Sequence, residues 1–145
     1  MEPWGSCLAM MDYAEIAAEA SADAIREIAE AVLNRLPVRI LKSPSPGMVM
    51  VRQVDPLENI LFNLGEAYVT ECEVEVDGLP GYGCVLGSGE DRALCSALLD
   101  AVIGGGHAVA AEITPLLEAE QRRIGERWDK ESKAATTTRV SFEVR

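Results

Sequence analysis

One nine-residue stretch, Tyr68–Val76, constrains most strongly how this chain folds. Its sequence, Tyr-Val-Thr-Glu-Cys-Glu-Val-Glu-Val, alternates small or apolar side chains with acidic ones. A period of two places successive side chains on opposite faces of a β-strand. Three glutamates on one face would repel one another if that face were buried. The stretch therefore predicts a strand with one face in the core and the other towards water or a basic partner.

A turn and a second strand are predicted directly after this stretch. Asp77-Gly78 is a typical turn sequence, and the short run Tyr82–Leu86 follows it. We expect this run to return as an antiparallel hairpin partner. A three-residue loop centred on Gly78 would place Cys84 opposite Cys72. That register leaves two states open for the thiols, free in a reducing compartment or joined as a disulfide.

Further strands are predicted upstream and at the end of the chain. Val38–Leu41 is short and β-branched, and Met48–Val51 is apolar on both faces. Between them, the Ser-Pro-Ser-Pro-Gly sequence of residues 43–47 predicts a tight loop. Near the C-terminus, Arg139–Val144 alternates again. It predicts a last strand over residues 138–144 that joins the sheet.

Helices are predicted in two regions. In the N-terminal part, residues 5–36, an apolar stripe at helical spacing and the capping residue Ser21 predict two helices. In the second region, residues 89–135, Ser88 is the expected N-cap, with Asp91 completing a capping box. The glycines at 104–106 should end the first helix there. The following helical pattern contains Pro115, which predicts either a kink or a fresh helix start.

These elements predict one α+β domain over residues 1–145, a length typical of a single domain. The expected order is ααββββααβ. The sheet, residues 38–87 plus the last strand, is mostly antiparallel, with four to five strands and helices packed on it.

The chain is strongly acidic, and its charge is uneven. Lys and Arg total 13 against 24 Asp and Glu, a formal net charge of −11 at pH 7. Residues 1–120 carry 6 basic and 20 acidic side chains, whereas residues 121–145 carry 7 basic and 4 acidic ones. A negative field repels phosphate backbones and anionic lipids. We therefore expect neither nucleic acid nor a membrane surface as a partner, and the basic end favours either a solvated helix or contact with an acidic protein.

The location expected from the sequence is cytoplasmic. No apolar stretch approaches the ~18 residues that a membrane helix needs. No Lys or Arg precedes Arg26, so the positively charged start of a secretory signal is not expected.

Motifs for cofactor or metal chemistry are weak. The four cysteines, of which Cys7 is the first, have no C-x-x-C spacing, so free thiols are favoured over a zinc site. A catalytic pair of a cysteine with the single histidine, His107, is left open by spacing alone. Gly87-x-Gly89 is followed by Glu90 and Asp91, whose carboxylates favour capping of a helix over phosphate binding. We expect no cofactor and no metal in this chain.

Five short motifs, in order and spacing, resemble the PhnG family, a subunit of the bacterial carbon-phosphorus lyase system that uses phosphonates. They are Phe62–Glu66, Val69-Thr70, Gly81–Gly83 with Val85–Gly87, Ala97–Ala101 and Thr138–Phe142. The resemblance covers residues 47–142. It implies an accessory subunit that supports PhnI, with PhnH and PhnL, in replacing the adenine of ATP by a phosphonate. The product is α-D-ribose 1-phosphonate 5-triphosphate, and radical cleavage belongs to PhnJ.

The resemblance supplies motif positions without assigned roles. Possible partner contacts are Asn63, Gly65, Glu66, Thr70, Tyr82 and Arg139. The leading hypothesis is an interaction subunit whose sheet and basic C-terminal helix dock on PhnI, with ATP used by the complex and homo-oligomers possible in isolation.

Two alternatives stay open at the sequence level. In the first, Glu66, Asp100 and Arg139 line part of the active site and act directly in base displacement. In the second, the chain is a stand-alone small-ligand binding domain, which requires a closed apolar pocket.

Overall fold

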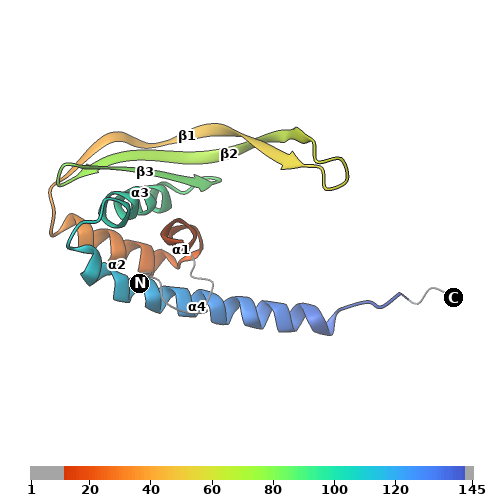
Figure 1. Ribbon diagram of the computed structural model, residues 1–145. Coiled ribbons are helices and arrows are strands. Elements are labelled where there is room, and N and C mark those ends of the chain that lie inside the picture. Colours follow the sequence, from red (N-terminus) through yellow and green to blue (C-terminus); the bar gives the residue numbers. More distant parts are fainter. Residues whose placement is uncertain (1–11, 143–145) are drawn as a thin grey trace.

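The computed structural model describes residues 12–142, which form a helical layer under one face of an antiparallel sheet (Figure 1). The helices are α1 (Tyr13–Glu19), α2 (Ala22–Leu33), α3 (Glu90–Leu99), the π-helical turn η1 (Asp100–Gly104) and α4 (Ala110–Thr137). The strands are β1 (Val38–Val54), β2 (Leu61–Val76) and β3 (Leu79–Leu86). The predicted α+β class is confirmed. The two N-terminal helices are confirmed as well, and the Ser21 hydroxyl caps the second by accepting from Ala24 N at 3.2 Å.

The strand count and the element order differ from the prediction. Within residues 12–142 the sheet has three strands in the order β1-β2-β3, so the expected four to five strands are wrong. The observed order is α1-α2-β1-β2-β3-α3-η1-α4. The predicted order ααββββααβ therefore fails at two places.

The first difference is that the two predicted strands Val38–Leu41 and Met48–Val51 are parts of one strand, β1, which runs through the expected loop at 43–47. Pro44 and Pro46 lack the N–H of a ladder, which an edge strand tolerates because one side of it has no neighbour. β1 is such an edge, and register shifts near Lys42 absorb the irregularity.

The second difference is the expected last strand over 138–144. Residues 138–142 form no strand, and 143–144 lie outside the described residues. The reason is the length of α4, which continues to Thr137 and carries the chain away from the sheet (Figure 1). The predicted helical stretch 5–11 also lies outside the described residues.

The hairpin between β2 and β3 has a tighter turn than predicted. Val76 pairs with Leu79, so the turn contains only Asp77 and Gly78, and both have positive φ, 49° and 82°. Positive φ at both central residues is the type I′ geometry that matches strand twist. The shorter loop shifts the register by one residue, so that Cys84 lies opposite Glu71 and not opposite Cys72.

The alternation of β2 is confirmed. Cys72, Val74 and Val76 are fully buried, whereas the exposed Glu73 points to the opposite face. On that outer face the charges of two neighbouring glutamates are balanced by β1, through the pairs Arg39–Glu75 and Lys42–Glu71. The basic partner that the acidic face needs is thus partly supplied by the chain itself.

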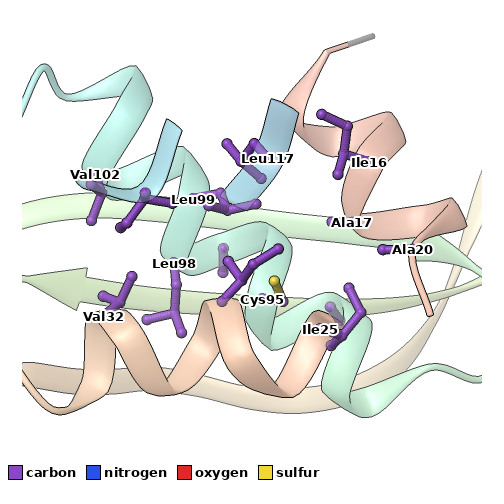
Figure 2. Packing of buried hydrophobic residues seen from close by; sticks show 14 of the residues in the cluster. Ile16, Ala17, Ala20, Ile25, Val32, Cys95, Leu98, Leu99, Val102 and Leu117 are labelled. Atoms are coloured by element: carbon purple, nitrogen blue, oxygen red, sulfur yellow. The ribbon is translucent and has the colours of Figure 1, made fainter. Parts of the chain in front are cut away.

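The core surrounds α3, which lies between the sheet and the other helices and is buried along most of its length (Figure 2). Small residues allow this close packing: Gly81 and Gly83 of β3 lie against Ala93 and Ala97 of α3. A Cβ on Gly81 would lie 2.2 Å from the Ala97 carbonyl oxygen, and one on Gly83 would lie 2.2 Å from the Ala93 carbonyl oxygen. Any side chain at either position would push the strand off the helix.

The start of α3 is capped differently from the prediction. Its N-cap is Gly89, without a side-chain cap, so the predicted Ser88–Asp91 capping box is wrong. Thr70 of β2 holds the N-cap residue in place: its hydroxyl accepts from Gly89 N at 3.2 Å and donates to Gly87 O at 2.7 Å. The predicted end of this helical region is confirmed, because η1 stops at Gly104. The next helix, α4, begins at Ala110, so Pro115 lies inside it and is not a fresh start.

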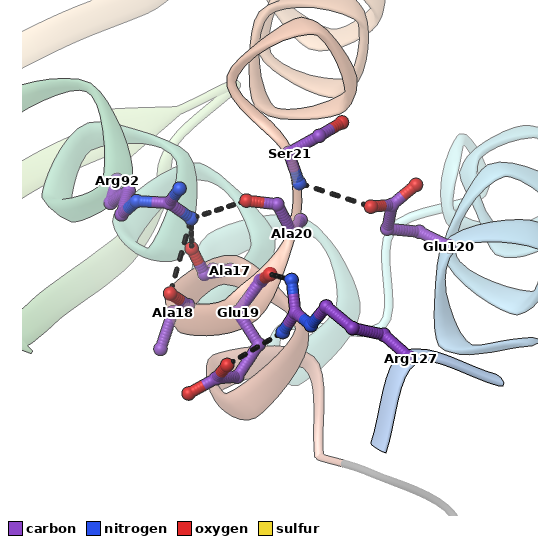
Figure 3. A network of polar contacts seen from close by, with 8 residues as sticks. All are labelled: Ala17, Ala18, Glu19, Ala20, Ser21, Arg92, Glu120 and Arg127. Atoms are coloured by element: carbon purple, nitrogen blue, oxygen red, sulfur yellow. Dashed lines mark hydrogen bonds and ion pairs between the residues drawn. The ribbon is translucent and has the colours of Figure 1, made fainter. Parts of the chain in front are cut away.

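Three side chains from distant parts of the chain, Arg92, Glu120 and Arg127, hold the junction of α1 and α2, and Arg127 does so by binding Glu19 (Figure 3). Arg92 of α3 donates to the carbonyl oxygens of Ala17, Ala18 and Ala20 at 3.2, 3.1 and 2.6 Å. These carbonyls belong to the C-terminal end of α1, which carries no basic residue of its own. From α4, the buried Glu120 accepts from Ser21 N at 3.0 Å. A buried carboxylate is stable here because both oxygens are used, the second by Arg123.

We expect Gly83→Ala to destabilise the fold by about 1–3 kcal/mol, because the added methyl group collides with α3 backbone. The matched control is Gly125→Ala, where a Cβ meets nothing within 4 Å and the residue is helical. At that position alanine lowers the backbone entropy of the unfolded chain, which should stabilise the folded protein by about 0.4–1 kcal/mol. Urea unfolding of both variants measures the difference, and equal effects would contradict the packing argument.

Candidate interaction surface

Half of the β1–β2 hairpin projects beyond α1, α2, α3 and the end of β3 (Figure 1). β3 ends with Leu86 opposite Val69, so β2 has no partner on that side before residue 69 within the described chain. We call residues 48–68 the hairpin arm. It consists of the second half of β1, the loop 55–60 and the first half of β2.

The hairpin arm is unusually apolar for an exposed element. Ten of its large hydrophobic side chains are exposed: Met48, Met50, Val51, Val54, Leu57, Ile60, Leu61, Phe62, Leu64 and Tyr68. Large apolar surfaces that stay exposed on a monomer mark interaction sites. One signal in the sequence points to the arm: four large apolar residues, at positions 60, 61, 62 and 64, follow directly on the turn-forming residues 55–59.

The loop at the tip of the arm is ordered by its own hydrogen bonds. Asp55 N donates to Ile60 O at 2.9 Å, and the Asp55 carboxylate accepts from Leu57 N at 2.9 Å. Asn59 adopts the left-handed conformation, with φ 56°, and its N–H donates to Asp55 O. These bonds hold Leu57 at the tip with 92% of its surface exposed.

The far half of α4 extends on the same side of the molecule as the arm (Figure 1). After Ile124 every helical residue is exposed, including Trp128. This half also lies in the basic part of the sequence, residues 121–145. The molecule thus offers an apolar strand pair and a basic helix end in one direction.

Three of the predicted contact residues lie in the hairpin arm. Asn63, Gly65 and Glu66 are all exposed on β2. Glu66 lies opposite Met50 of β1. Among residues 12–142 no Lys, Arg or His forms an ion pair with Glu66.

Asp100 has a structural environment. One carboxylate oxygen accepts from the Tyr13 hydroxyl at 2.8 Å and the other accepts from Tyr82 N at 2.9 Å. Asp100 therefore ties α1 and β3 to the start of η1. The hydrogen bond to this carboxylate is the main cause that raises the pKa of Tyr13 to about 12.

Tyr82 and Thr70 also make internal contacts. The Tyr82 hydroxyl donates to Glu71 at 2.7 Å on the outer face of the sheet, and Lys42 contacts the other Glu71 oxygen at 3.2 Å. The bond from Tyr82, followed by the contacts with Lys42, lowers the pKa of Glu71. The same bond raises the pKa of Tyr82. Thr70 is buried near the start of α3, where it bonds to Gly87 and Gly89 as described above.

The structure does not bring the three candidate catalytic residues together. Asp100 bonds to Tyr82, which lies opposite Glu73. Glu66 is seven residues away from Glu73 along β2, about 23 Å in an extended strand. Arg139 is exposed beyond the end of α4. Glu66 and Asp100 are therefore too far apart to act on one reacting atom of a small substrate.

The cysteines and the histidine form no nucleophilic pair among the described residues. Cys72, Cys84 and Cys95 are free, and Cys7 lies outside the described residues. Burial raises the pKa of Cys95 to about 12, which disfavours the reactive thiolate. His107 instead bonds to Asp77 through Nε2 at 2.9 Å and accepts from Val109 N through Nδ1. The histidine thus fastens the β2–β3 turn to the loop before α4.

A cavity of about 400 Å³ lies at the start of α3, lined by residues that include Ile25, Ser88, Glu90, Asp91 and Arg92. It is open to solvent, and its two carboxylates disfavour an anionic ligand. It is not the closed apolar pocket that a stand-alone small-ligand binding domain requires.

Comparison with known proteins agrees with the sequence motifs. The profile of the family described as "Phosphonate metabolism protein PhnG" matches residues 11–145. The chain belongs to the PhnG family. A relative from Rhizobium meliloti (strain 1021), "Alpha-D-ribose 1-methylphosphonate 5-triphosphate synthase subunit PhnG", is 32% identical over 120 residues, 78% of this chain and 72% of the relative. The resemblance identified from the five motifs is confirmed.

The structure explains what some of these family motifs do. Gly81–Gly83 is the segment that packs on α3, and Thr70 is the residue that binds the N–H of its N-cap residue, Gly89. Phe62–Glu66 makes no such internal contact and lies on the hairpin arm. None of the helices within residues 12–142 has the length and apolarity needed to cross a membrane.

We expect Tyr13→Phe to reduce the loss of stability at alkaline pH. Because the pKa of Tyr13 is raised from 10.0 to about 12, the neutral phenol stabilises the fold fully below pH 10, and this contribution is lost as the pH approaches 12. The variant should be less stable by about 1 kcal/mol at neutral pH, and its free energy of unfolding should fall less between pH 10 and 12. Urea unfolding across this range measures both effects. Identical pH profiles would contradict the structural role of Asp100.

Proposed function

We propose that this chain is an accessory subunit of a synthase that forms α-D-ribose 1-methylphosphonate 5-triphosphate, and that the hairpin arm docks on a partner subunit. The observation that carries the proposal is the exposure of ten large hydrophobic residues on the arm. The printed name of the Rhizobium meliloti relative, a subunit of such a synthase, supports it. In this proposal PhnI is the main partner and carries the nucleosidase chemistry. PhnH, PhnL and PhnJ belong to the same system.

The charges of the described residues favour an accessory role. Enzymes that bind triphosphates gather basic groups around the anion. Here two of the three cations of the sheet are already paired, Arg39 with Glu75 and Lys42 with Glu71, and Arg92 is occupied by three carbonyl oxygens. ATP is thus used by the complex, and this chain contributes binding surface without holding a cofactor.

The docking surface combines two features with different tasks. The apolar arm supplies area whose burial drives association. The basic half of α4 adds charge that steers the approach to an acidic partner surface. If the purified chain stays monomeric and does not associate with PhnI, the proposal is wrong.

We expect the double variant Phe62→Ser with Leu64→Ser to weaken binding to PhnI by about 10–100-fold, since apolar anchors dominate interface energies. Both side chains are exposed, so the free energy of unfolding should change by less than about 0.5 kcal/mol. Calorimetric titration of the purified subunits measures the affinity.

The matched control for this prediction is Ile40→Ser with Leu41→Ser. These two residues are exposed to a similar extent, 49% and 53% against 43% and 65%, but lie on β1 outside the arm. Equal loss of affinity in both double variants would show that the arm has no special part in docking.

A second candidate function is direct participation of Glu66 in base displacement, which its exposed carboxylate permits. For Glu66→Ala we expect assembly and adenine release to fall together, and both to recover when the variant subunit is added in excess. Native mass spectrometry and an adenine-release assay measure the two quantities. A fully assembled complex that no longer releases adenine would instead support a direct role.

A further inference from the structure

The inner strand of the hairpin arm has an open edge. β2 is the central strand of the sheet only where β3 covers it, from Val69 to Val76. Before Val69, β2 is paired with β1 alone within the described chain. Its other side presents N–H and C=O groups to the surroundings, as in any edge strand.

The direction of the backbone groups follows from the hairpin. In an antiparallel pair, alternate residues turn their N–H and C=O towards the same neighbour. Tyr68 faces the β3 side, because its carbonyl oxygen accepts from Gly87 N at 2.9 Å. Glu66, two residues earlier, faces the same side at a level that β3 does not reach. By the same alternation, Met50, which lies opposite Glu66, turns its N–H to the outer edge of β1.

The two edges of the arm differ in protection. The outer edge belongs to β1, which carries the basic residue Arg52 within the arm and Lys42, Pro44 and Pro46 just before it, where two register shifts also lie. Prolines, basic side chains and bulges are the usual devices that block pairing with another strand. The open edge of β2, residues 61–68, has neither a proline nor a basic residue, and its one irregularity lies at Leu64.

The charge at this edge indicates what covers it. Glu66 is the only charged residue between 61 and 68, and its neighbours Leu64, Tyr68 and Met50 are exposed apolar side chains. Covering this surface would remove water from the carboxylate, which is costly unless a cation accompanies it. No cation of the described chain pairs with Glu66.

We infer that the partner subunit adds a β-strand to the open edge of β2 at residues 61–68 and places an Arg or Lys against Glu66. The added strand continues the sheet where β3 stops and covers the apolar side chains of the arm. This inference rests on the proposed function and specifies how the docking takes place. Side-chain packing alone would leave the backbone groups of Glu66 unpaired.

Amide hydrogen exchange on the complex of this chain with purified PhnI tests the inference at single residues. The N–H of Glu66 should exchange at least about tenfold more slowly in the complex than in the free chain, as one added hydrogen bond implies. The N–H of Met50, on the outer edge of β1, serves as the internal control and should keep its rate.

A charge-reversal pair tests the cation. Glu66→Arg should weaken binding by about tenfold more than Glu58→Arg, because only Glu66 faces the added strand and like charges there repel. Glu58 lies in the loop at the tip of the same arm and is also exposed, so the two variants change the net charge equally.

Three other outcomes of these experiments would overturn the inference, each for a different reason. A stable complex without protection at Glu66 rejects strand addition and leaves the proposed function in place. Protection at Glu66 that depends on the concentration of the isolated chain assigns the edge to a second copy. The absence of any complex rejects the proposed function together with the inference.

Discussion

The close contact between β3 and α3 determines the rest of the structure. Because Gly81 and Gly83 have no side chains, the strand backbone lies directly on the helix, and α3 becomes the centre of the core. A single helix of ten residues covers only a short length of the strands that it packs on. The strands β1 and β2, with 17 and 16 residues, are much longer than this cover. Their excess length is the hairpin arm, so the same packing that makes the core also leaves an uncovered surface.

The sequence alone predicted those parts of the fold that depend on local periodicity. The alternation at Tyr68–Val76, the two N-terminal helices and the stop at Gly104 are local patterns, and the structure confirms them. The continuous strand β1 was not predictable in this way, because Pro44 and Pro46 are tolerated only if the strand lies at an edge, which is a property of the whole sheet. The register of Cys84 depended similarly on one residue of turn length.

In the candidate site, too, only part of what the structure shows could be predicted from the sequence. The motif positions Asn63, Gly65 and Glu66 were found from the sequence, and they lie on the surface that the proposal uses. Their neighbours on the arm were missed, because an exposed apolar strand has the same composition as a buried one. Asp100 was a candidate in one of the two alternatives, and its contacts with Tyr13 and Tyr82 show that it joins α1 and β3 to η1.

The unprotected edge of β2 also bears on how the cell handles this protein. A strand edge that accepts one neighbour accepts others, including the edge of another misplaced chain. Copies made in excess of their assembly are therefore prone to aggregation or to degradation. Synthesis of this chain and its partner in equal amounts would keep the number of such unassembled copies low.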